Sequence, residues 1–248
     1  MSRLKILNIW VDPLSREEAI ARVSGYLKNG KRPHAIFASN PEKNFSVPAD
    51  PDLYKVYKEA DILLPDGVGV VYAARLLHNR TFSRIPGSEF IFNVCQLAAK
   101  EGYGVFVYGA REDVNAGAVK SLRKRFQGLR IVGRANGYEN HLDALERINA
   151  SKAEILFIAL GSPKQEKWFS DFRSELKYVK VVQGIGGTLD TITGAVKRAP
   201  HFWCRHNLEW LYRLITDPRR ISRQKVLPIF AGLVLLEKSK QILGLKRA

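Results

Sequence analysis

The chain has 248 residues and 46% hydrophobic content, which suffices for a sizeable core in one large or two small domains and argues against disorder. Two cysteines and an N-terminus without a secretory leader pattern favour a reducing cytoplasm, and the longest apolar run, 226–236, is too short to cross a membrane. The net charge is +16, and the segment from Val196 onward holds 12 basic against three acidic residues, so we expect an anionic partner there.

Short strand-like runs alternate with segments of helical length along the chain. The expected strands are 5–11, 34–39, 61–65, 103–109, 129–133, 153–161 and 177–184. This alternation predicts an α/β fold in which a parallel sheet carries helices on both faces.

Three of these strands end in small-residue turns that open a helix, namely "VYGARED", "ALGSPKQE" and "QGIGGTLD". In a parallel sheet such turns gather at the C-terminal edge, where ligands bind and where helix N-termini favour phosphates. The candidate ligand contacts in these turns are Tyr108, Gly109, Gly161, Gly186 and Gly187.

Asp66 interrupts the apolar stretch "ADILLPDGVGVV", residues 60–71. It directly follows a predicted strand, so it should lie at the rim where a ligand would bind. An aspartate before "GVGVVYAARLL" is also what an ordinary helix N-cap looks like. The local sequence leaves both interpretations open.

Other motifs have structural explanations. "SPKQ" at 162–165 predicts a capping box, with Ser162 at the cap and Gln165 at the third helical position. "DPD" at 50–52 resembles a metal-binding acidic pair, but Pro51 suits a first helical residue, so we expect a helix start.

No cofactor or metal site is expected. "GIGG" at 184–187 lacks the next glycine of a dinucleotide fingerprint, because Leu189 occupies that position. A P-loop motif is absent, and the histidines and cysteines do not have the spacing of zinc ligands.

Five blocks in order carry a family resemblance: "LLPDGVGVV", "RIPGSEF", "GSPKQEKW", "GIGGTLD…GAVKRAP" and "LEWLYRLITDPRRISR". Together they resemble the WecG/TagA/CpsF family of bacterial glycosyltransferases over nearly the whole chain. The resemblance implies an inverting, metal-independent enzyme that transfers a sugar, in the best-known cases N-acetylmannosamine, from a UDP-sugar to a lipid-diphosphate-linked N-acetylglucosamine. It also implies a Rossmann-like core, 1–195, and a C-terminal appendage, 196–248, in a self-associating cytoplasmic enzyme peripheral to the inner membrane face.

The resemblance also implies roles for individual residues. Asp66 matches the proposed general base, and an apolar flank such as "ILLP" can raise the proton affinity of a carboxylate. Arg84 and Gln165 match pocket positions. Arg213, Arg220 and Arg223 match appendage arginines that reach substrate phosphates, for which a forked guanidinium is well suited.

One position departs from the family pattern. Where relatives often read Thr-x-Asn-x-Glu, this chain has "ASNPE", so Ala38 replaces the hydroxyl while Asn40 remains. Ser39 is adjacent but should face the other way in a strand. The identity of the donor sugar therefore stays open between N-acetylmannosamine, its uronic acid and glucose.

The basic tail allows several partners. Nucleic acid, anionic lipid headgroups and a phosphorylated substrate all fit its charge, as does a merely solvated tail. A Rossmann-like RNA-binding or RNA-modifying protein would stack bases on Trp203, Trp210 and Tyr212. A non-catalytic nucleotide-sugar sensor would bind donor without forming product. We favour the enzyme, expect no nucleic acid partner, and expect the tail to dock on anionic membrane.

Overall fold

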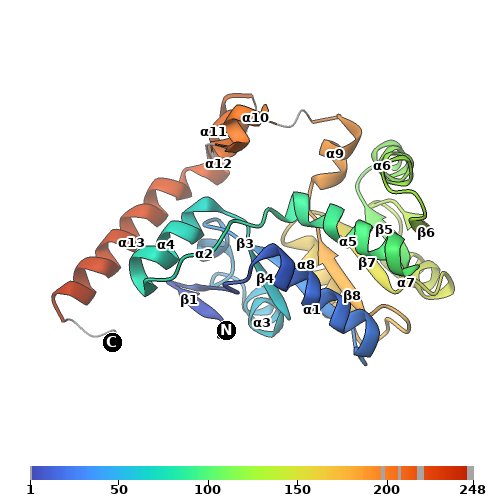
Figure 1. Cartoon of the computed structure of the whole chain (residues 1–248), viewed down its shortest axis with the longest axis horizontal. Coiled ribbons are helices and arrows are strands. Elements are labelled where there is room, and N and C mark those ends of the chain that lie inside the picture. The colour runs from blue at the N-terminus through green and yellow to red at the C-terminus, as the bar shows by residue number, and fades with distance from the viewer. Residues whose placement is uncertain (1, 197–198, 206–207, 217–220, 245–248) are drawn as a thin grey trace.

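The computed structural model describes residues 2–196, 199–205, 208–216 and 221–244. In this part of the chain, six parallel strands form a central sheet (Figure 1). Their spatial order is β4-β3-β8-β7-β5-β6. The strands are β3 (His34–Ser39), β4 (Ile62–Pro65), β5 (Gly104–Gly109), β6 (Arg130–Ala135), β7 (Ile155–Ala159) and β8 (Val181–Gly184). The predicted α/β class with a parallel sheet is confirmed.

Helices cover both faces of this sheet because side chains alternate along each buried strand. On β5, Phe106 and Tyr108 enter one hydrophobic cluster, while Val105 and Val107 enter the other. The first cluster is covered by α3 (Pro51–Glu59), α4 (Val68–His78), α7 (His141–Ala150) and α8 (Lys164–Phe172). The second is covered by α1 (Arg16–Asn29), α5 (Gly87–Glu101), α6 (Glu112–Arg125) and α9 (Thr188–Thr193).

The first expected strand, 5–11, does not form as a single strand. The chain forms an antiparallel hairpin instead, β1 (Leu4–Ile6) with β2 (Ile9–Val11), apart from the six-stranded sheet. The turn comes at Leu7, whose φ of 52° is left-handed, and the backbone N–H of Asn8 donates to Asn44 Oδ1 at 3.0 Å. The run is apolar enough for one strand, but the turn lets Ile6 and Ile9 both enter the core.

The start of α3 follows the sequence expectation. Asp50 is its N-cap and accepts from the backbone N–H groups of Asp52 and Leu53, while Pro51 occupies the first turn. The carboxylate of Asp50 also forms an ion pair with Lys167 at 2.5 Å. The predicted helix start at "DPD" is confirmed.

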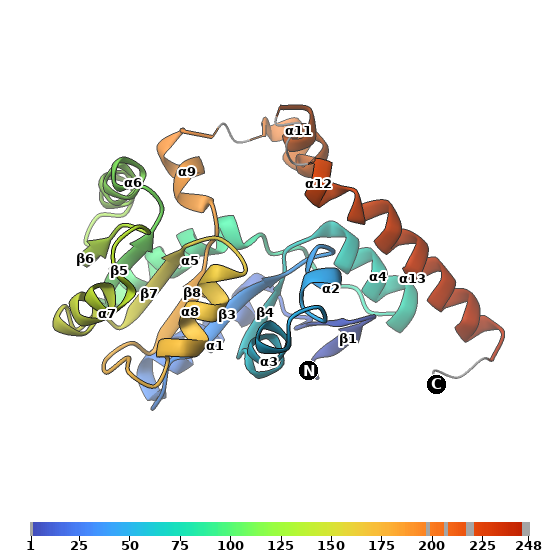
Figure 2. The same cartoon turned by 180° about the vertical axis from the view of Figure 1, so that it is seen from behind.

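The C-terminal helices lie beyond α9 and end along the core. They are α10 (His201–Arg205), α11 (Glu209–Thr216), α12 (Ile221–Gln224) and α13 (Val226–Ile242), and a short α2 (Lys43–Ser46) follows β3. Helix α13 runs beside α4 (Figure 2), and its Phe230 and Val234 belong to a core cluster. The helical appendage therefore shares buried contacts with the core, and the boundary at residue 195 stays a prediction.

Candidate active site

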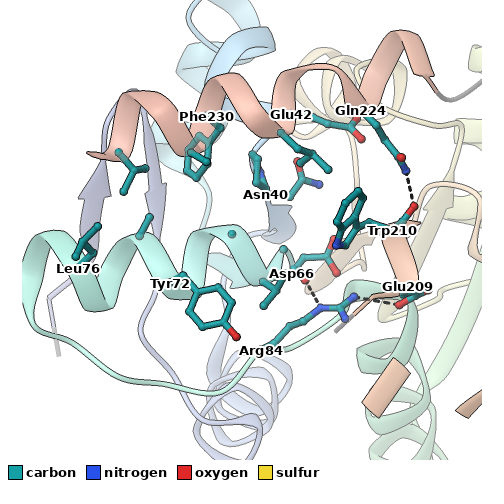
Figure 3. Close-up of a pocket in the computed structure, with 18 of the residues that line it drawn as sticks. Asn40, Glu42, Asp66, Tyr72, Leu76, Arg84, Glu209, Trp210, Gln224 and Phe230 are labelled. Carbon is teal, nitrogen blue, oxygen red and sulfur yellow. Dashed lines mark hydrogen bonds and ion pairs between the residues drawn. The ribbon is translucent and has the colours of Figure 1, made fainter. Parts of the chain in front are cut away.

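Two clefts open at the carboxyl ends of the strands and meet at Asn40, Glu42 and Asp66. The polar cleft, about 630 Å³, lies among the turns after β3, β4, β7 and β8; its polar lining includes Lys43, Tyr57, Ser162, Gln165, Glu166, Gly186 and Thr188. The apolar groove, about 540 Å³, lies between α4 and α13 (Figure 3); its lining includes Tyr72, Leu76, Trp210, Leu227, Phe230, Val234 and Leu235. Asp66 thus borders spaces of opposite polarity.

Asp66 does not cap the helix that follows it. The N-cap of α4 is Gly67, which makes no side-chain capping bond, because Asp66 stands one residue too early. Its Oδ1 accepts instead from the backbone N–H of Gly87 at 3.0 Å, the first residue of α5. The positive end of the α5 dipole therefore stabilises a negative charge on this half-buried carboxylate. Gly67 is needed for close approach, since a Cβ there would lie 2.7 Å from Pro41 Cδ.

Arg84 connects the turn of Asp66 to the C-terminal helices (Figure 3). Its Nε donates to the backbone carbonyl of Asp66 at 2.5 Å, and a terminal nitrogen forms an ion pair with Glu209 on α11 at 3.1 Å. Both side chains are largely shielded from solvent, so the pair is screened less than a surface salt bridge. Sequence reasoning found Arg84 but missed Glu209, which looks like an ordinary acid in the first turn of a helix.

Gln165 is tied to a loop of the polar cleft, and its predicted capping box is wrong. Helix α8 has Pro163 at its N-cap without a side-chain capping bond, because the hydroxyl of Ser162 accepts from Lys43 Nζ instead. Gln165 is buried, and its Oε1 accepts from the backbone N–H of Gly186 at 2.9 Å. Gln165 joins the turn after β7 to the turn after β8, so it fixes the position of both turns in the wall of the cleft.

Lys43, Tyr57 and Glu166 form a buried cluster that the sequence did not reveal. Glu166 Oε1 accepts from Lys43 Nζ at 3.2 Å and from the Tyr57 hydroxyl at 3.2 Å. Burial, followed by the charge of Glu166, raises the pKa of Tyr57 well above its usual value, so it stays a neutral donor. Lysine and glutamate are normally exposed, and no local pattern marks these two as buried partners.

The remaining predicted contacts divide into two groups. Asn40 borders both clefts, and Gly161, Gly186 and Gly187 line the polar cleft. Arg220 lies outside the described residues, and so do the side chains of Arg213 and Arg223.

Tyr108 and Gly109 line neither cleft, contrary to expectation. Tyr108 is fully buried, its hydroxyl pairs with His141 Nδ1 at 2.7 Å, and burial raises its pKa to about 12. Gly109 has a φ of 118° and lies so close to Ala159 that a Cβ would be 2.5 Å from the Ala159 carbonyl carbon. Both residues serve packing between β5 and its neighbours.

Ala38, which replaces the threonine of the family pattern, lines the polar cleft. Ser39 is fully buried on the other side of the strand, and its hydroxyl donates to the carbonyl of Trp10 at 2.7 Å. The expectation that Ser39 faces away is confirmed.

Within the described ranges, no group of three or more His, Cys, Asp or Glu side chains is arranged to hold a metal ion. In the same part of the chain, the helices are all too short or too polar for a membrane span.

The known proteins that this chain resembles are glycosyltransferases. Residues 4–243 match the family described as "Glycosyl transferase WecG/TagA/CpsF family". The chain is 37% identical over 208 residues to an N-acetylglucosaminyldiphosphoundecaprenol N-acetyl-beta-D-mannosaminyltransferase of Bacillus subtilis (strain 168), covering 83% of this chain and 80% of the relative. A protein of the same name from Bacillus spizizenii is 36% identical over 201 residues, covering 81% and 78%.

Proposed function

The chain belongs to the WecG/TagA/CpsF family of glycosyltransferases, and from this membership we propose that it transfers N-acetylmannosamine from a UDP-sugar to lipid-diphosphate-linked N-acetylglucosamine. Such a reaction belongs to the synthesis of a cell-surface polymer. The observation that carries the proposal is the meeting of a polar cleft and an apolar groove at one carboxylate, Asp66.

The polar cleft suits the donor. It lies at the carboxyl ends of parallel strands, where open α/β sheets bind nucleotides. Its walls offer hydroxyl, amide and charged side chains together with the glycine-rich turn at Gly186 and Gly187, as a sugar nucleotide requires.

The apolar groove suits the lipid part of the acceptor. Leu76, Phe230 and Leu235 line it, and Tyr72 adds an aromatic ring that is 62% exposed. An isoprenoid chain would bury this surface and its own, each Å² contributing roughly 25 cal/mol. The relatives' name specifies undecaprenol as the acceptor's lipid, which agrees with an apolar groove beside the reacting centre.

Asp66 is proposed as the general base. The acceptor hydroxyl would approach from the side of the groove and the anomeric carbon from the side of the polar cleft. A bond then forms between the acceptor oxygen and the anomeric carbon, the proton passes to the Asp66 carboxylate, and the bond to the diphosphate breaks. UDP leaves with that electron pair, and a single displacement inverts the anomeric centre.

Other residues hold the base and the leaving group. The Gly87 N–H orients Asp66 Oδ1, and Arg84 holds its backbone carbonyl. The negative charge on the departing diphosphate requires cationic or N–H donors. Arg213, Arg220 and Arg223 remain proposed for that role or for the acceptor's diphosphate.

We also propose metal-independent transfer at the inner membrane face, with self-association in solution. The Asp50 carboxylate of "DPD" serves as a helix cap and as the partner of Lys167, which supports the first point. On α13, Leu236 and Ile242 are more than half exposed beside Lys238 and Lys240, which supports membrane docking.

The test is a product assay with a panel of UDP-sugars and a lipid-diphosphate N-acetylglucosamine, analysed by mass and by NMR of the new linkage. The expected product is β-linked N-acetylmannosamine from the α-configured donor, formed equally with and without a chelator. No product with any donor, or activity that a chelator removes and manganese restores, would contradict the corresponding part of the proposal.

A further inference from the structure

The polar cleft is poor in positive charge for a site that takes a nucleoside diphosphate sugar, the donor on whose assignment this inference rests. Among the described residues of its lining, Lys43 is the only basic side chain, whereas Glu42, Asp66 and Glu166 are acidic. A diphosphate needs cationic or N–H donors in its cleft. Lys43 is therefore the residue to examine.

Lys43 is held in place and yet incompletely satisfied. It is 7% exposed, which is rare for lysine and requires compensating partners. Its Nζ donates to Glu166 Oε1 at 3.2 Å and to the Ser162 hydroxyl, and it lies 5.3 Å from the centre of the Tyr57 ring. An ammonium group has three N–H donors. Two have hydrogen-bond acceptors among the described residues, and the third has none.

Glu166 shows the matching deficiency. Its Oε1 accepts from Lys43, Tyr57 and Gln165, the last at 3.4 Å. Its Oε2 is buried and has no hydrogen-bond partner among the described residues. An unpartnered carboxylate oxygen in a residue that is 1% exposed is costly, so the buried charge of Glu166 depends on Lys43 as its partner.

We propose that Lys43 is a donor-binding residue whose third N–H binds a phosphate oxygen of the nucleotide sugar. Glu166 is its positioning residue, because Oε1 accepts from Nζ and holds the ammonium group at the wall of the cleft. A phosphate of the sugar nucleotide offers the acceptor that the third N–H of Lys43 lacks. The buried pair keeps the charge of Lys43 directed at the cleft, although burying the pair costs more than it contributes to folding unless the geometry is good.

The test compares ligands that differ only in their phosphates. Binding of UDP, UMP and uridine is measured calorimetrically for the full-length wild type, Lys43→Met and Lys164→Met. Lys164 is the matched control, because it is an exposed lysine two residues from Ser162 that does not line the polar cleft. We expect Lys43→Met to weaken UDP binding about tenfold or more and uridine binding by less than about threefold, as loss of a charge-assisted bond to phosphate predicts. Lys164→Met should bind all three ligands like the wild type.

A second variant separates binding from folding, since Lys43→Met alone leaves Glu166 as an unpaired buried charge. Lys43→Met with Glu166→Gln removes both charges and keeps an acceptor for Tyr57, so it should recover the melting temperature while UDP binding stays weak. If the double variant regained wild-type UDP affinity, or if Lys43→Met weakened uridine and UDP equally, the pair would be structural and the inference wrong. A wild type that bound no UDP would overturn the proposed donor itself, and this inference with it.

Discussion

Phe230 joins the C-terminal helix to the core and also forms one wall of the apolar groove, so Phe230→Ala tests both roles. The side chain is 3% exposed and belongs to the cluster that contains Val70 and Ala73 of α4. Its ring lies near Gly69, where a Cβ added to the glycine would be 3.8 Å away, which shows how closely α13 and α4 approach.

The expected loss of stability follows from the burial. Removing a buried phenylalanine side chain costs about 3–5 kcal/mol, of which part is transfer free energy and part the cavity that remains. For a chain of this size each kcal/mol lowers the melting temperature by about 2–4 °C, so we expect a decrease of about 6–20 °C. The loss also removes the buried ring that holds α13 against α4, so the groove should deform and KM for a long-chain acceptor should rise.

The assays are thermal and urea denaturation followed by circular dichroism, and steady-state kinetics with a long-chain acceptor. UDP affinity should change by less than about twofold, because Phe230 does not line the polar cleft. Ile229→Ala is the matched control on the same helix. Ile229 is 53% exposed and does not line the groove, so its loss should cost less than about 0.5 kcal/mol and leave KM unchanged. If Phe230→Ala left the acceptor's KM unchanged, or if the control had an equal effect, the groove would not bind the lipid.

Four individual groups or surfaces carry further predictions. Asp66→Asn keeps an acceptor for the Gly87 N–H, so UDP should still raise the melting temperature while kcat falls about a hundredfold or more; a wild-type rate would exclude Asp66 as the base. Burial raises the pKa of the Cys95 thiol to about 12, so in a Cys204→Ser background a thiol reagent at pH 8 should label Cys95 only after denaturation, and rapid labelling of the native protein would contradict this. Because the pKa of Tyr108 is about 12 when folded against a usual value of 10.0, the unfolded chain loses its proton first. Stability should then fall as pH rises through this range, less steeply in Tyr108→Phe; equal slopes would show that Tyr108 is not responsible. Sedimentation with anionic liposomes should weaken as salt is added, since each basic residue near the surface contributes about 1 kcal/mol that salt screens, and equal binding to neutral liposomes would remove the electrostatic argument.

Two helix-capping motifs in the sequence differ in whether they form a cap in the structure. "DPD" capped α3 as expected because the cap, the proline and the two N–H groups it serves all lie within four residues. "SPKQ" did not form a capping box, because Ser162 has a competing partner, Lys43, 119 residues earlier in the chain. A capping motif shows which hydrogen bond a side chain can make locally. Here the ammonium group of a residue distant in sequence binds the Ser162 hydroxyl instead.

The alternation of apolar strands with helices determined the parallel sheet, because residues buried on both faces of a strand must be apolar whatever surrounds them. The same logic placed Asp66 at the rim, since it directly follows a buried strand. Only the tertiary structure determined the surroundings of Asp66. Its carboxylate accepts from an N–H of α5, its backbone carbonyl accepts from Arg84, which pairs with Glu209 on α11, and it lies where the two clefts join. The partners Arg84 and Glu209 are 125 residues apart, and Lys43 and Glu166 are 123 apart. Local sequence patterns reflect interactions between residues a few positions apart. Contacts at such large separations form only after the strands have assembled into the sheet and α13 has packed along α4.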